Sequence, residues 1–388
     1  MTTQTARILN RQFVLAFFAQ LALSSVSCLL IPTLPIHLSR IGSGEVEIGI
    51  LIGAFSLSSL FLRPFVGGLL LKISEVTFMF AGALLFALTS AGYLLAFPFW
   101  PLLAVRALQG IGAALFYTAA ATFATNSSPA DRLGQALSYY YLAFNIAFAL
   151  APSFGMFLIN SFSATVLFLF CTGLSLISLL IISKLETNPI HRLENLTLKR
   201  GSFLSRKALL PSIVVFMASL IWGALTAFFP LYAIEHGMTN PGLFFGIFAI
   251  MVIAGRAFGG QMLDFYSRES VVLLCLMTCI IAMSILLVFK TSLMFLVAAG
   301  IWGIGHAFIY PALAAYTLDL AAPYRGPAIA TFQALDDLGV GLGSVIMGIV
   351  LRLSNYQFMF LSLAFIGLIN LSYFYYFVRG GGARENNT

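Results

Sequence analysis

The chain has 388 residues, of which 60% are hydrophobic and only 9% are charged. Soluble globular domains carry roughly 25% charged residues, so this composition excludes a soluble protein and predicts a polytopic membrane protein. The formal net charge of +7 is also what a nucleic-acid-binding protein would show, and the positions of the basic residues decide between the two interpretations.

Long apolar runs follow one another along the whole chain. A membrane-spanning helix needs about 20 mostly apolar residues, and about twelve runs of this kind are present. They are too long for barrel strands and lack strict alternation, and backbone groups in lipid must be satisfied within the segment, so we predict helices. The predicted spans are 13–38, 46–70, 76–97, 99–124, 133–159, 163–183, 208–234, 241–263, 270–289, 292–318, 326–351 and 356–378. The predicted fold class is an all-α membrane protein with twelve transmembrane helices.

The basic residues gather in alternate loops. The first span is too long for a signal-peptide core and lacks a small-residue cleavage site, so we expect it to stay in the protein. With the N-terminus in the cytoplasm, fourteen basic residues fall in inside segments: Arg7, Arg11, Lys72, Arg132, Lys184, Arg192, Lys199, Arg200, Arg206, Lys207, Arg268, Arg325, Arg379 and Arg384. The outside loops hold three: Arg40, Lys290 and Arg352. This positive-inside bias predicts a multi-pass protein of the cell (inner) membrane with both termini cytoplasmic, and no nucleic-acid partner.

A polar stretch, Lys184 to Lys207, separates the sixth and seventh spans. We therefore predict an N-terminal six-helix half (1–184), a cytoplasmic linker (185–207), a C-terminal six-helix half (208–379) and a cytoplasmic tail (380–388). The four cysteines, Cys28, Cys171, Cys275 and Cys279, lie inside apolar runs with no His or carboxylate nearby in the sequence. We expect them to be small apolar residues, with no disulfide, metal site or cofactor.

The two halves repeat each other. The segment QGIGAALFYTAAATFA from Gln109 matches WGIGHAFIYPALAAYT from Trp302 without gaps at GIG, one Ala and the Tyr. The end of the second span, from Arg63, likewise matches the end of the eighth, from Arg256. A parallel repeat of six spans places a pseudo-twofold axis along the membrane normal, and transporters built in this way bind substrate near the midplane between the halves.

Three motifs carry a family resemblance. Arg106-Ala-Leu-Gln109-Gly110-Ile-Gly112-Ala-Ala114 fits R-x-x-Q-G-x-G-x-A, and Ala147-x-x-x-Ala151-Pro152-x-x-Gly155 keeps the Pro and final Gly of G-x-x-x-G-P-x-x-G. The loop motif G-x-L-x-D-R-x-G-R is better kept from Gly260 to Arg268, with Asp264, than after Gly68, where Lys72 and Glu75 replace the Asp and the next Gly. Over essentially its whole length the sequence resembles the major facilitator superfamily. The resemblance implies a secondary transporter, and the span-five motif favours the proton-coupled efflux branch, with Pro152 and Gly155 bending that helix.

Charged residues inside spans are costly and by default functional. Asp337 shares a small or polar stripe with Gln333, Gly341, Ser344 and Gly348, and it corresponds to Asn145 in the internal repeat. Because burial favours the protonated form of a carboxylic acid, we predict that Asp337 carries a proton; the alternative is a hydrogen bond across helices. Asp336 is rotated by about 100° on the helix and is a second candidate that can instead face a neighbouring helix.

Arg106 and His306 complete the candidates for proton coupling. Arg106 can contact an anionic substrate group or tune a proton carrier, or it can brace neighbouring carbonyls. His306 can accept a proton or a substrate hydrogen bond, or it can simply pack in its helix.

Two further groups of side chains are predicted from the spans and turns. Polar or amphipathic side chains expected to line a substrate cavity are Gln20, Gln109, Tyr117, Asn145, Trp222, Tyr310 and Gln333. Charged side chains expected to act in gating are Arg63, Asp131, Arg132, Arg256, Asp264, Arg268 and Arg325. Solvated turns and helix-end capping are the alternatives for the second group.

The function predicted from these features is transport. No P-loop, HExxH or GxSxG motif is present, so we expect no enzyme and no ATP-driven pump. We predict a monomer that works by alternating access and exports a small organic molecule in exchange for protons. Proton-coupled uptake of a metabolite or organic anion is the alternative, and a non-transporting receptor or membrane enzyme is the alternative of a different class. The substrate, the direction and the choice of H⁺ or Na⁺ stay open at this point.

Overall fold

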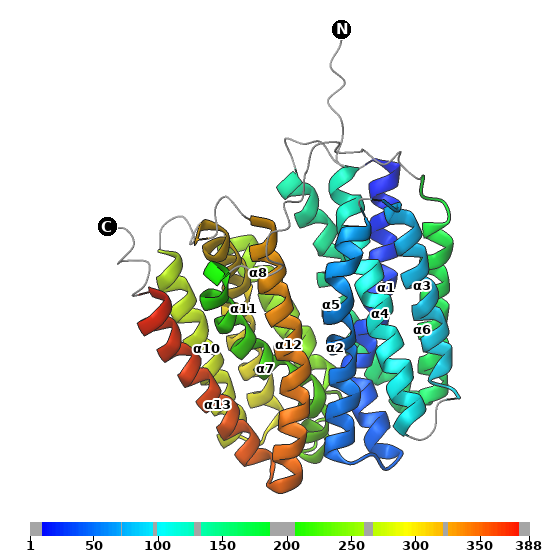
Figure 1. The fold of residues 1–388 in the computed structure, drawn as a ribbon. Coiled ribbons are helices and arrows are strands. Elements are labelled where there is room, and N and C mark those ends of the chain that lie inside the picture. Colours follow the sequence, from blue (N-terminus) through cyan, green and yellow to red (C-terminus); the bar gives the residue numbers. More distant parts are fainter. Residues whose placement is uncertain are drawn as a thin grey trace, which may run out of the picture. The chain divides into compact units, whose positions relative to one another are not determined.

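The computed structural model describes residues 10–70, 72–95, 99–127, 133–186, 206–259, 267–320 and 325–379 (Figure 1). Helices account for nearly all of these residues, and no strand occurs in them. In chain order they are α1 (Arg11–Arg40), α2 (Glu45–Leu69), α3 (Glu75–Gly92), α4 (Phe99–Asn126), α5 (Leu133–Ser161), α6 (Ala164–Ile182), α7 (Arg206–Glu235), α8 (Gly242–Gly259), α10 (Arg268–Val288), α11 (Ser292–Leu320), α12 (Arg325–Leu353) and α13 (Tyr356–Tyr373), followed by a π-helical turn, η2 (Phe374–Arg379).

The helices have the length and surface of membrane spans. Within the described ranges, eleven are long and apolar enough to cross a bilayer, and α8 is apolar over the shorter stretch Gly242–Ala257. Large apolar side chains point outward from the helices; Phe61 is 72% exposed and Trp100 is 73% exposed. Such exposure is expected where the solvent is lipid. The predicted all-α membrane fold is confirmed.

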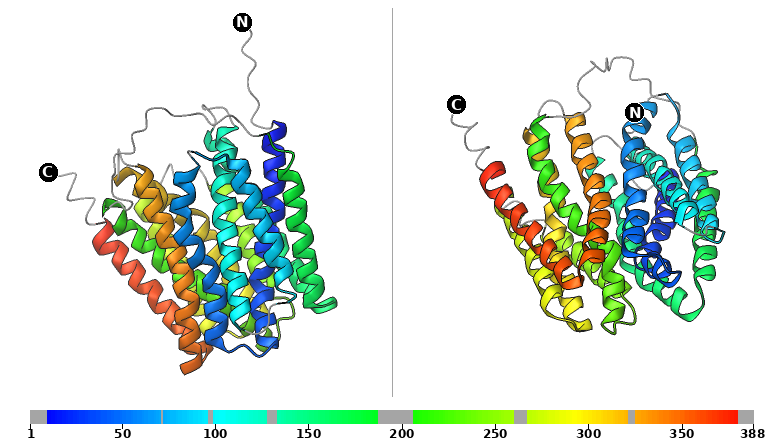
Figure 2. Two further views of the ribbon diagram at one scale, coloured as in Figure 1. Left: turned by 45° about the vertical axis from the view of Figure 1, so that its right-hand side comes forward. Right: turned by 60° about the horizontal axis from the view of Figure 1, so that its bottom comes forward.

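The chain packs as two compact units. The first contains residues 1–33 and 57–197, and the second contains residues 34–56 and 198–388. The end of α1 and the start of α2 therefore pack with the second unit. Each unit is a bundle of long helices (Figure 2). The predicted linker 185–207 lies mostly outside the described residues and the tail 380–388 lies wholly outside them, so the predicted domain limits stay predictions.

Close helix packing in the first unit depends on small residues. At Gly82 of α3, an added Cβ would lie 2.7 Å from the carbonyl oxygen of Gly112 on α4. At Gly155 of α5, it would lie 2.9 Å from the carbonyl oxygen of Leu29 on α1. Both distances are below normal contact, so only glycine allows these backbones to approach so closely. Pro152 lies inside α5, which is helical on both sides of it.

In the second unit, α12 is held between two neighbours. On one side, Gly339 faces α7, where an added Cβ would meet the carbonyl oxygen of Phe216 at 2.5 Å. On the other side, Gly348 faces the start of α2, where the Cβ would meet the carbonyl oxygen of Glu45 at 2.7 Å. This packing fixes the rotation of α12 and so decides where its two adjacent aspartates point.

Candidate functional site

Asp336 is bound by two hydroxyl groups from two other helices. Ser219 of α7 donates a hydrogen bond to Oδ1, and Tyr310 of α11 donates to Oδ2 at 3.0 Å. The side chain is half-buried. Hydrogen bonds to a charged group are stronger than those between neutral groups, so Asp336 joins α7, α11 and α12 within the second unit. This is the arrangement of a carboxylate that braces neighbouring helices.

Asp337, the adjacent residue, is only 8% exposed. It lies one turn from Gly341 on a stripe that continues through Ser344 and Gly348, all of which are buried. The stripe beyond Asp337 packs on the start of α2, because Gly53 would place a Cβ 2.6 Å from the carbonyl oxygen of Gly341. Gln333, at the other end of the predicted stripe, is exposed. Asp337 is thus a buried carboxylate next to a packed interhelical contact.

Arg106 is enclosed within the first unit and is 8% exposed. Its Nη1 donates to Oε1 of Gln109 at 2.9 Å, and the Tyr93 hydroxyl donates to the same oxygen at 2.8 Å. The Tyr93 ring stacks on Phe168 of α6, with the ring centroids 5.0 Å apart. Because Oε1 accepts from both donors, the orientation of the Gln109 amide is fixed. The two signature residues Arg106 and Gln109 therefore act together, with Tyr93 as a partner that the sequence did not single out.

Other predicted cavity residues of the first unit pair with hydroxyl groups. The Tyr140 hydroxyl donates to Oε1 of Gln20 at 2.6 Å, which joins α5 to α1. The hydroxyl groups of Ser27 and Tyr117 lie 3.0 Å apart and join α1 to α4. Asn145 is half-buried on α5. Hydrogen bonds thus connect α1 to α4 and to α5, the three helices that carry the predicted cavity residues of this unit.

Arg63 and Arg256, which correspond in the internal repeat, both contact their own bundles. Nε of Arg63 donates to Oγ of Ser59 at 3.1 Å, and Nε of Arg256 donates to the carbonyl oxygen of Ala307 on α11 at 3.3 Å. The other predicted gating residues are not described as side chains: Asp131, Arg132 and Asp264 lie outside the described residues, and Arg268 and Arg325 are seen only as the first residues of α10 and α12.

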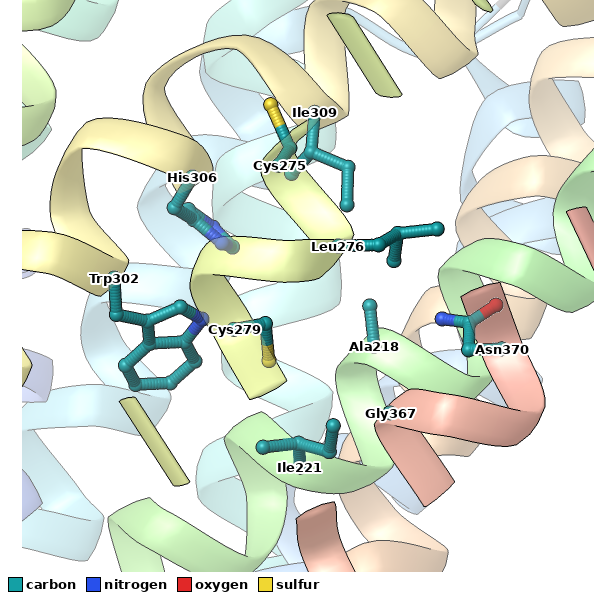
Figure 3. A pocket seen from close by; sticks show the side chains of 10 residues that line it. All are labelled: Ala218, Ile221, Cys275, Leu276, Cys279, Trp302, His306, Ile309, Gly367 and Asn370. Carbon is teal, nitrogen blue, oxygen red and sulfur yellow. The ribbon is translucent and has the colours of Figure 1, made fainter. Parts of the chain in front are cut away.

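His306 lies in an aromatic cluster of the second unit. Its ring centroid is 6.0 Å from Trp222, 5.1 Å from Phe248 and 6.0 Å from Trp302. A small cavity lies beside this cluster, between α7, α10, α11 and α13 (Figure 3). Trp222, which is predicted to line a substrate cavity, contacts the rings of Phe245, Phe248 and Trp302.

Several partners could not be singled out from the sequence. Tyr93, Ser219, Ser27 and Tyr140 are hydroxyl residues in apolar runs, and such residues are too common there to mark a site. Asn370 is different, because it is a carboxamide in the middle of the last span and is fully buried. An amide in that position is a signal that sequence reasoning could have used.

Comparisons with known proteins agree with this architecture. The family model described as Major Facilitator Superfamily matches residues 13–264 and 240–388. The staphylopine export protein of Staphylococcus aureus is 23% identical over 376 residues, covering 90% of this chain and 91% of that protein. The quinolone resistance protein NorA of Staphylococcus aureus is 24% identical over 366 residues, covering 88% and 90%.

Solved structures of transporters share the fold. The nucleoside transporter NupG has a TM-score of 0.76 at 14% identity, covering 94% of this chain and 98% of that chain. The human organic anion transporter MFSD10 has a TM-score of 0.71 at 16% identity, covering 94% and 99%. At these identities the likeness establishes the arrangement of helices.

Proposed function

Because the chain belongs to the major facilitator superfamily, we propose that it is a secondary active transporter that exports a small organic molecule in exchange for protons. It works as a monomer in the cell membrane, with both termini in the cytoplasm, and it is not an enzyme. Its partners are the substrate, protons and the bilayer.

Burial of Asp337 is the observation that carries the proton coupling. An ionised carboxylate inside a span is expensive, and such residues mark ion pathways and proton relays. Asp337 is 8% exposed, in the middle of α12. Its neighbour Asp336 accepts hydrogen bonds from Ser219 and Tyr310 and so has a structural reason to be there. Because Asp337 is the more deeply buried of the two aspartates, it is the better candidate for the proton carrier.

Alternating access is supported by the contact beside this carboxylate. Gly49 and Gly53 of α2 pack against the backbone of Gly341 and Ser344 on α12. The Ser344 hydroxyl donates to Gly341 on its own helix, so a contact made mainly by small residues can separate and form again. Protonation of Asp337, one turn from Gly341, can then bias whether this contact is closed, because a neutral side chain is tolerated in a dry contact and a charged one is not.

The direction of transport is proposed from two observations. The span-five motif around Pro152 is the one associated with exporters, and the relatives by sequence are an export protein and a drug resistance protein. Arg106 supports a substrate that carries an anionic group, although its contacts with Gln109 and Tyr93 suit a brace equally well. Proton-coupled uptake of a metabolite or organic anion is the competing proposal.

The test uses purified protein in liposomes that contain a pH-sensitive dye. An outward-directed or inward-directed proton gradient is imposed, and a panel of radiolabelled organic anions, zwitterions and cationic drugs is offered. Three proteins are compared: wild type, Asp337→Asn and the matched neighbour Asp336→Asn. Exchange of labelled for unlabelled substrate is measured in parallel, because exchange needs binding and alternation but no net proton movement.

We expect wild type to move protons when a substrate moves, in the opposite direction. Asp337→Asn should keep substrate exchange and lose substrate-dependent proton movement, while Asp336→Asn should keep the coupling. Proton movement in the same direction as substrate would establish the importer instead. Unchanged coupling in Asp337→Asn would refute the proposed proton carrier, and absence of transport for every compound with folded wild type would count against transport itself.

A further inference from the structure

The two hydroxyl groups that meet Asp336 are held in place by the surface of α12 itself. The Tyr310 ring packs edge-on against Phe332, with the ring centroids 4.9 Å apart. Ser219 lies against Gly339, where an added Cβ would be 2.8 Å from the Cβ of Ser219. Phe332 and Gly339 stand one turn before and one turn after Asp336, so all three share a helix face. Both donors are therefore positioned by packing as well as by their hydrogen bonds.

The adjacent aspartates lie in environments that favour opposite charge states. Both carboxylate oxygens of Asp336 accept a hydrogen bond, Oδ1 from Ser219 and Oδ2 from Tyr310, and hydrogen bonds donated to a carboxylate favour its charged form. Asp337 is more deeply buried than its half-buried neighbour, and burial favours the neutral form. A pair of acids in contrasting environments separates into one that stays ionised and one that holds a proton.

Mutual repulsion strengthens this separation. Two carboxylates that are close together do not both ionise readily, and they titrate as a pair instead of as independent groups. We propose that Asp336 and Asp337 share one proton, and that Ser219 and Tyr310 are positioning residues that keep the negative charge on Asp336 and so place the proton on Asp337. The inference rests on the proposed proton coupling, because it states how the proton carrier is selected.

Other ionisable groups occur on the helices packed around this pair. Arg256 of α8 donates to the carbonyl oxygen of Ala307, one turn before Tyr310 on α11. His306 of α11 faces the rings of Trp222 and Phe248. The ionisable residues of α7 and α13 lie only in the first and last turns of those helices, and in α2 the segment that packs on α12 carries exposed Glu45 and Glu47 in its first turn. The further tyrosine of α11, Tyr316, packs with an apolar cluster. The donors observed on Asp336 are thus hydroxyl groups.

The experiment is infrared spectroscopy of the purified protein in lipid nanodiscs, titrated across neutral pH. A protonated carboxylic acid has a C=O stretching band that a carboxylate lacks, so protonation is measured without a substrate. In wild type we expect an acid band that persists to neutral pH, and Asp337→Asn should remove it. In Asp336→Asn the same band should titrate about one pH unit lower, because the neighbouring negative charge is gone. An unchanged midpoint in Asp336→Asn, or a band that Asp336→Asn removes and Asp337→Asn leaves, overturns the proposal.

The role of the two donors is tested in the Asp337→Asn background. Adding Ser219→Ala and Tyr310→Phe should make an acid band of Asp336 appear, because its charged form has lost both hydrogen bonds. Tyr310→Phe alone should give a smaller effect in the same direction, which keeps the test valid if the combined variant does not fold.

The matched control is Ser284→Ala with Tyr376→Phe in that background. Ser284 donates to its own helix at Ile280, and Tyr376 is exposed, so no acid band should appear. If the folded donor variants behave like this control, the positioning role is overturned.

This result is separable from the outcome of the liposome assay. A shared proton that follows the expected pattern, in a protein whose substrate moves without protons, would support the positioning role and refute the coupling. Coupling that is lost in Asp337→Asn, together with an unchanged midpoint in Asp336→Asn, would support the carrier and overturn the shared proton.

Discussion

A single methyl group on α2 should shift the conformational equilibrium of this protein. Gly53 packs on α12, and an added Cβ would lie 2.6 Å from the carbonyl oxygen of Gly341 and 2.8 Å from Oγ of Ser344. Ordinary van der Waals contact begins near 3.4 Å, so Gly53→Ala forces the two backbones apart. Overpacking of this kind costs typically about 1 to 3 kcal/mol.

The cost applies only while the start of α2 lies on α12. If this contact opens during the transport cycle, the open state escapes the clash and gains population. A difference of about 1 to 3 kcal/mol corresponds to a change of about 5- to 150-fold in the ratio of the two states. Gly67→Ala is the matched control, because Gly67 lies on the same helix and has nothing within 4 Å of an added Cβ. Both variants gain the same helix propensity.

The assay is a pulsed electron spin resonance distance measurement between spin labels at Glu47 and Leu353, which are both exposed. The four native cysteines are replaced by alanine in this background. Gly53→Ala should increase the long-distance population relative to wild type and Gly67→Ala, with the protein still monodisperse and helical. Equal distance distributions in the two glycine variants would show either that this contact stays closed throughout or that the packing is looser than described, and would refute the reasoning.

Two further predictions concern stability. Tyr310→Phe removes one donor to Asp336 and should lower the free energy of unfolding by about 0.6 to 1.7 kcal/mol, measured by denaturation in mixed micelles. The control, Tyr376→Phe at an exposed position, should leave the free energy of unfolding unchanged. An equal loss in both variants would contradict the assigned hydrogen bond. Gly223→Ala drives a methyl group into the backbone of α12 at Val340, whereas Gly300→Ala meets nothing within 4 Å. We expect the first to lower the melting temperature and the second to raise it slightly, because alanine is the better helix former by about 0.5 to 1 kcal/mol; a Gly223→Ala protein as stable as wild type would rule out the tight α7–α12 seam.

The helical character of the chain follows from the sequence with little ambiguity. Backbone N–H and C=O groups in lipid must be hydrogen-bonded within their own segment. An apolar run of sufficient length therefore predicts a helix without knowledge of its neighbours. Most predicted spans agree closely with the helices. The differences are at the ends: the third span was predicted to reach residue 97, but α3 ends at Gly92, where a cap at Tyr93 takes over. The sequence stays apolar beyond residue 92 although the helix ends there, because the end of a helix depends on local backbone conformation and hydropathy does not report it.

The internal repeat and the costly residues were also determined by sequence alone. Arg106, Asp336 and Asp337 stand out because a charged side chain inside a membrane span is energetically costly and by default functional. The pairing of Arg106 with Gln109 is within reach of the sequence as well, since residues three apart share a helix face. Partners from other helices are not: Tyr93, sixteen residues from Gln109, caps the end of the preceding helix.

The two aspartates show what only tertiary structure decides. The sequence implies that adjacent residues on a helix point about 100° apart, but it does not show which side chains of other helices each of them contacts. Ser219 lies 117 residues from Asp336 along the chain, and Tyr310 lies 26 residues away. They meet because glycine contacts with α7 and with the start of α2 set the rotation of α12. Composition determined that this chain is a bundle of membrane helices with costly charges inside, whereas the packing of small residues between helices determined which side chains surround each of those charges.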